Sequence, residues 1–111
     1  SASSKKILLI HPDLQWLKQT RDFLRTEGFM TFATRSLGIA LELQAHHRPE
    51  VILFALNLGR TNGQDVISAL HHQDAHAVLV VLVDEKEKSR LSELAPGSFF
   101  DGIVTPCEGK I

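Results

Sequence analysis

The chain has 111 residues, of which 43% are hydrophobic and 23% charged, and its formal net charge is −1. This length fits one globular domain, and the balanced charge excludes a broad electrostatic surface for nucleic acid or anionic membrane. No apolar run reaches the roughly 20 residues that a membrane span needs. The single cysteine, Cys107, excludes an internal disulfide and favours a reducing compartment, so we expect a cytoplasmic location.

The first strand and helix are predicted from residues 7–28. The continuous apolar run at 7–10 is typical of a strand covered on both faces. Asp13 can cap the following helix, because its carboxylate can accept the free amides of the first turn, and Gly28 can end that helix in a left-handed conformation. The expected apolar stripe comprises Leu14, Leu17, Phe23 and Leu24.

A weaker and more polar run at residues 29–34 indicates an edge strand. Helical spacing follows it, and the dipeptide Arg48-Pro49 is expected to stop this second helix. The apolar residues of the second stripe are Leu37, Ala40, Leu41 and Leu43.

The second half of the chain repeats the alternation of strand and helix. Apolar runs at residues 51–56, 78–83 and 103–104 predict three further strands. Helical spacing predicts a third helix around Val66, Ile67 and Leu70, and a short fourth around Leu91 and Leu94. Asp84 and Glu87 have the spacing of a capping box for the fourth helix.

Alternating strands and helices force parallel pairing with right-handed crossovers, so we expect a doubly wound α/β sheet. In such sheets, ligands and chemistry lie beyond the carboxyl ends of the strands. The residues expected at those ends are 11–13, 55–57, 83–84 and 105–106.

The chain resembles the receiver domain of bacterial response regulators over residues 5–106. The resemblance is carried by the first strand and its turn at 6–13, the third strand at 47–58, Gly63, and the turn at 104–106. It implies a CheY-like, flavodoxin-like sheet of five parallel strands in the order 2-1-3-4-5. We therefore expect one receiver-like domain at 5–106 and flexible ends at 1–4 and 107–111. The family's fifth helix is expected to be missing or truncated.

The resemblance also implies a phosphorylation site, whose reactive groups are replaced here. Receivers carry an acidic pair after the first strand, a phosphoacceptor aspartate ending the third, a hydroxyl on the fourth and a lysine after the fifth. The corresponding residues are His11, Pro12, Ala55, Val83 and Thr105. The family's aromatic residue on the fifth strand corresponds to Gly102. We therefore predict a degenerate, phosphorylation-independent pseudo-receiver with no metal and no cofactor.

The predicted function is protein–protein interaction within a larger bacterial regulatory protein of two-component type. The expected partner is another protein or an attached output domain. The missing helix is expected to leave a flank of the first helix open, including Phe23, and a second copy or the rest of the natural protein could cover this face. We expect no membrane contact and no direct nucleic-acid binding.

An alternative is a small-molecule-binding regulatory domain that uses the altered site. Its predicted pocket comprises His11, Asp13, Asn57, Asp84 and Thr105. The paired histidines at 46–47 and 71–72 are expected to interact favourably with helix C-termini, because no zinc-site spacing is present. An enzyme ranks last, since no constellation of residues supports one.

Overall fold

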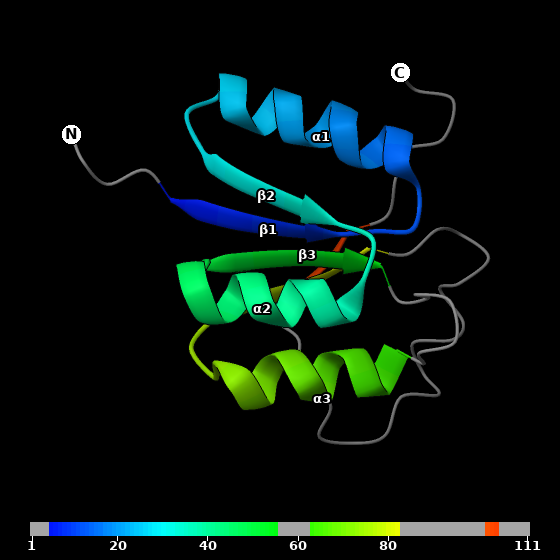
Figure 1. Cartoon of the computed structure of the whole chain (residues 1–111), viewed down its shortest axis with the longest axis vertical. Helices are drawn as coiled ribbons and strands as arrows, with labels where there is room; N and C mark the ends of the chain where they lie inside the picture. Colours follow the sequence, from blue (N-terminus) through cyan, green and yellow to red (C-terminus); the bar gives the residue numbers. More distant parts are fainter. Residues whose placement is uncertain (1–4, 56–62, 83–101, 105–111) are drawn as a thin grey trace.

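A computed structural model of the chain describes residues 5–55, 63–82 and 102–104. Strands and helices alternate along the first two thirds of the chain (Figure 1). The elements in chain order are β1 (Lys6–Ile10), α1 (Leu14–Thr26), β2 (Met30–Thr34), α2 (Leu37–His47), β3 (Val51–Ala55), α3 (Gly63–Gln73), β4 (Val78–Leu82) and β5 (Gly102–Val104).

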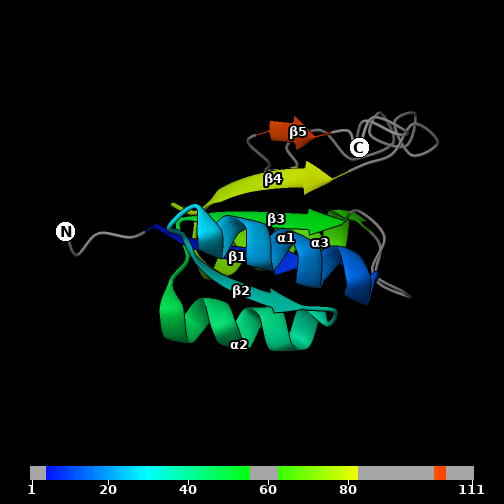
Figure 2. The same cartoon turned by 90° about the horizontal axis from the view of Figure 1, so that it is seen from above.

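The five strands form one parallel sheet in the order β2-β1-β3-β4-β5, which confirms the predicted flavodoxin-like topology. Helix α1 covers one face of this sheet, and α2 and α3 lie against the other (Figures 1 and 2). Because successive strand residues point to opposite faces, each strand contributes to both sides of the core. Leu8 and Phe54 pack toward α2 and α3, whereas Ile7 and Leu9 pack with Leu17 of α1.

The predicted helix ends are confirmed where they are described. The Asp13 side chain accepts hydrogen bonds from the backbone N–H groups of Gln15 and Trp16, as expected of an N-cap. Gly28 follows the C-cap of α1 with φ of 97°, a left-handed conformation that glycine adopts at low cost. Helix α2 ends at Arg48, which is also left-handed, immediately before Pro49.

The predicted apolar stripe of α1 was wrong at Leu14, whereas Phe23 is exposed as expected of the flank that a missing fifth helix leaves open. Leu17 is buried, but the side chains of Leu14 and Phe23 are 56% and 62% exposed. Positions 14 and 23 lie on opposite flanks of the helix relative to Leu17 and Leu24, so only the middle of the stripe meets the sheet. Strand β2 begins at Met30 rather than at residue 29.

Several predicted features lie outside the described residues. They are the fourth helix, its capping pair, the segment after Val104 and both chain ends. Within the described part of the chain, none of the helices has the length and apolar character required to cross a membrane.

Candidate functional site

The carboxyl edge of the sheet brings together the ends of β1 and β3. Ile10 pairs with Phe54, so His11 follows β1 beside the last residue of β3, Ala55. Ala55 is only 7% exposed and packs in the hydrophobic core with Ile10 and Phe54. Its methyl group has no lone pair, so Ala55 itself offers no oxygen or nitrogen ligand at this strand end.

His11 is held in place by three neighbours. Its backbone N–H donates to the carbonyl of Thr34 at 3.2 Å, which extends the pairing of β1 with β2 by one residue. Its Nδ1 accepts the backbone N–H of Asp13 at 3.0 Å, and its ring stacks on Trp16 with centroids 4.4 Å apart. An accepting Nδ1 assigns the proton of the neutral imidazole to Nε2. His11 therefore acts as an ordered turn residue.

The carboxylate of Asp13 serves the first turn of α1. It accepts the N–H of Gln15 at 3.0 Å and that of Trp16 at 3.4 Å. The side chain is exposed, so water can solvate its other oxygen. These contacts confirm the predicted capping role of Asp13.

Pro12 offers no side-chain ligand, but its carbonyl oxygen accepts a hydrogen bond of 2.9 Å from Nε of Arg35. Arg35 follows β2, the strand next to β1, and brings a positive charge to this edge of the sheet. Arg35 was not predicted from the sequence, because it lies 23 positions from Pro12 and belongs to no motif. The usable signal was its place directly after an adjacent parallel strand.

The alternative pocket receives no support from the described residues. Asn57, Asp84 and Thr105 lie outside them, as does Val83. The two described members, His11 and Asp13, engage each other and the first turn of α1. Among the residues at 5–55, 63–82 and 102–104, no group of three or more metal-ligating side chains could hold an ion. The paired histidines lie in the last turns of α2 and α3, as predicted.

Comparison of sequences gives relatives among response regulators. No family model matches the chain. The polar-differentiation response regulator DivK of Brucella anthropi is 30% identical over 70 residues, which is 63% of this chain and 57% of DivK. DivK of Brucella abortus is 30% identical over 63 residues, which is 57% of this chain and 51% of that protein. The match thus spans little more than half the length of these curated relatives.

Solved structures that include receiver domains are similar to almost the whole chain. A CheY-like receiver domain from Methylobacillus flagellatus has a TM-score of 0.78 at 18% identity, covering 96% of this chain and 90% of that one. The receiver domain of an HD domain-containing protein from Pseudomonas fluorescens has a TM-score of 0.81 at 16% identity, with coverages of 93% and 82%. An adenylate cyclase from Rhodopirellula baltica has a TM-score of 0.82 at 18% identity, with coverages of 96% and 80%. At such identities the likeness establishes the fold, which is CheY-like. With the sequence matches, it supports a receiver domain.

Proposed function

We propose that the chain is a receiver-type signalling domain that acts through protein–protein interaction without being phosphorylated. The observation that carries this proposal is Ala55, a buried methyl group at the end of β3. In the receiver family, this position holds the aspartate that accepts the phosphoryl group. An alkyl side chain cannot form an acyl phosphate.

The end of β1 supports the same conclusion. Phosphoryl transfer relies on positioned charge and on Mg²⁺, which prefers oxygen ligands in an octahedral arrangement. Pro12 has no ligating side chain, and Nδ1 of His11 is occupied by the N–H of Asp13. The nearby carboxylate of Asp13 caps α1. A metal site of the receiver kind would need these groups rebuilt.

The names of the similar proteins suggest the setting in which the domain works. DivK is named a response regulator, and two structural neighbours are an HD domain-containing protein and an adenylate cyclase. We propose that this chain likewise belongs to two-component signalling and acts on an attached output domain or a separate protein in the cytoplasm. Neither catalysis nor nucleic-acid binding is assigned to the domain itself.

Phosphodonor treatment tests the proposal. Trp16 is the single tryptophan and stacks on His11, so its fluorescence reports on the strand-end turn. We expect no saturable quenching by Mg²⁺ and no mass gain of one phosphoryl group after incubation with acetyl phosphate. DivK of Brucella anthropi, treated in parallel, shows whether the donor and the metal are active under the same conditions. Saturable quenching together with a phosphoryl adduct on this chain would overturn the proposal.

A further inference from the structure

A groove of about 310 Å³ lies between α1 and the connection from β2 to α2. Its apolar floor is formed by α1, β2 and the first turn of α2, and positively charged side chains line it from both sides. The apolar members are Leu14, Leu17, Ala33 and Ile39, and the charged members are Lys18, Arg21 and Arg35. None of the described residues that line this groove carries a carboxylate. A site with this lining favours a ligand that is both anionic and apolar.

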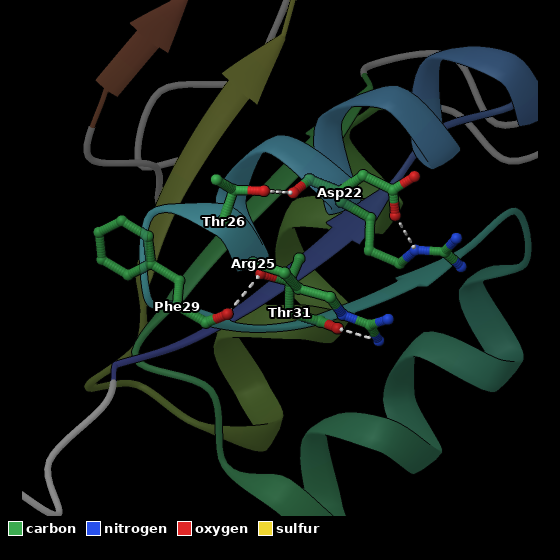
Figure 3. Close-up of polar contacts among 6 residues, drawn as sticks. Asp22, Arg25, Thr26, Phe29 and Thr31 are labelled. Atoms are coloured by element: carbon green, nitrogen blue, oxygen red, sulfur yellow. Dashed lines mark hydrogen bonds and ion pairs between the residues drawn. The ribbon is translucent and has the colours of Figure 1, made fainter.

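The positive charge is organised along one flank of α1. Lys18, Arg21 and Arg25 are three and four residues apart, so they lie on the same side of the helix as Leu14. This flank faces the sheet edge, because Arg25 reaches β2 and donates from Nη2 to the carbonyl of Thr31 at 3.0 Å (Figure 3). The basic side chains of α1 therefore lie along the β2 edge of the sheet.

The groove cations keep hydrogen-bond donors available for a partner. Arg35 uses Nε on the carbonyl of Pro12, and Arg21 uses Nε on Asp22 at 3.3 Å. Each guanidinium has five N–H donors, so the outer forks that suit a carboxylate remain. The Arg21–Asp22 pair is partly exposed and joins adjacent residues, so it competes weakly with an incoming anion. Lys18 is exposed on the same rim.

Strand β2 borders the groove as an open sheet edge. The backbone N–H of Met30 donates to the carbonyl of Lys5, and the carbonyl of Thr34 accepts from the backbone N–H of His11. The backbone groups of Met30 and Thr34 therefore point toward β1. In a parallel pair, the alternate residues point their backbone groups the other way, which places those of Thr31 and Ala33 on the outer edge. Arg25 covers the carbonyl of Thr31, whereas Ala33 lines the groove. An extended chain could therefore pair with the edge at Ala33.

We propose that this groove, formed by α1 and the β2–α2 connection, binds an acidic peptide segment that carries apolar side chains and belongs to a partner protein. The apolar side chains of the segment pack on Leu14 and Ile39, which are 56% and 52% exposed, and its carboxylates pair with Lys18, Arg21 and Arg35. The hollow has the size of a few side chains and a strand edge beside it, which fits a peptide better than the flat surface of a bilayer. This inference rests on the proposed interaction role and adds the chemistry of the partner.

Selection of random short peptides on the immobilised full chain, followed by fluorescence anisotropy of the selected peptides, tests this groove. We expect enrichment of peptides that combine Asp or Glu with Leu, Ile or Val, and weaker binding as salt is raised. Lys18→Glu and Arg35→Glu should each weaken binding about tenfold or more, because each replaces an attraction by a repulsion. Lys5→Glu is the matched control, since Lys5 is exposed and precedes β1 at the opposite end of the sheet.

A second pair of variants, one test and one control, examines the apolar side chains of the groove. Ile39→Ser should weaken peptide binding, whereas Met30→Ser, at a residue 47% exposed and outside the groove lining, should not. Circular dichroism shows whether each variant is folded, and Leu14→Ser is tested instead if Ile39→Ser is unfolded.

Three outcomes of the peptide experiments would overturn the inference. They are the absence of any enrichment, the selection of peptides without acidic residues, and equal binding by the Lys18→Glu and Lys5→Glu variants. The inference would also be overturned if the chain bound phosphatidylserine vesicles but no peptide, and if Lys18→Glu abolished this vesicle binding. Phosphorylation of the chain would instead overturn the proposed function and leave this result standing.

Discussion

The imidazole of His11 stacks on the indole of Trp16, with ring centroids 4.4 Å apart and an interplanar angle of 22°. The same imidazole accepts the N–H of Asp13, whose carboxylate caps the helix that carries Trp16. The turn between β1 and α1 is thus closed by its own side chains. In a receiver this turn is expected to hold a metal ion, and here hydrophobic stacking and a helix cap occupy it.

Removal of the His11 ring should loosen this turn. His11→Ala deletes the stack and the Nδ1 acceptor, and we expect the free energy of unfolding to fall by about 1 kcal/mol. The emission of Trp16, the single tryptophan, should shift to longer wavelength because water reaches the indole. Urea unfolding and fluorescence spectra measure both effects. His46→Ala, at an exposed residue in the last turn of α2, is the control. An unchanged emission maximum in His11→Ala would contradict the stacked arrangement.

Loss of the helix cap should destabilise α1. Asp13→Ala removes the acceptor for two backbone amides, at an expected cost of about 1 kcal/mol in the free energy of unfolding, whereas Asp13→Ser should retain most of the cap. Asp22→Ala removes an exposed carboxylate of the same helix and should change stability by less than about 0.5 kcal/mol. Chemical denaturation compares the three variants. Equal effects of Asp13→Ala and Asp22→Ala would show that the cap contributes nothing.

Restoration of the receiver carboxylates should carry an energetic cost. The combined substitutions His11→Asp, Pro12→Asp and Ala55→Asp crowd like charges at one strand end, and Ala55 is nearly buried. We expect the triple variant to lose about 2 kcal/mol or more in chelator and to recover part of it in Mg²⁺ by mass action. Thermal unfolding with and without Mg²⁺ measures this. If the triple variant is as stable as the parent in chelator, the neutral residues at these three positions do not stabilise the strand end.

The two kinds of α1 position should respond differently to truncation. Leu17 is 2% exposed and packs with Ile7 and Leu9, so Leu17→Ala should cost about 2–4 kcal/mol in the free energy of unfolding. Phe23 is 62% exposed in the single chain, so at concentrations too low for self-association Phe23→Ala should cost less than about 1 kcal/mol. Urea unfolding of both variants gives the comparison. A large loss in Phe23→Ala would mean that this ring is covered.

Self-association should depend on the same exposed ring. Phe23 and Val78 are exposed on the α1 side of the sheet, and Leu53, which packs in the cluster beneath α1, is only half-buried. We predict that a second copy can cover these residues, so that the parent sediments as a dimer and Phe23→Glu as a monomer. Analytical ultracentrifugation measures this for both proteins. A monomeric parent whose sedimentation is unaffected by Phe23→Glu would remove the interface from this face.

The order of elements and their local ends could be predicted from the sequence. Continuous apolar runs identify buried parallel strands, and Asp13 and Gly28 end α1 through interactions within a few residues of themselves. The parallel topology then follows from strand–helix alternation, since crossovers have one hand. The absence of an ionisable side chain at Ala55 is also a property of the sequence alone.

Only the tertiary structure decided which surfaces these elements present. Periodicity placed Leu14 in the apolar stripe of α1, but the helix packs a narrower strip against the sheet, so this side chain is exposed. The groove depends on contacts between distant positions, such as Arg35 with Pro12 and Arg25 with the edge strand. No spacing in the sequence predicts such contacts, because the residues meet only when α1 packs against β2.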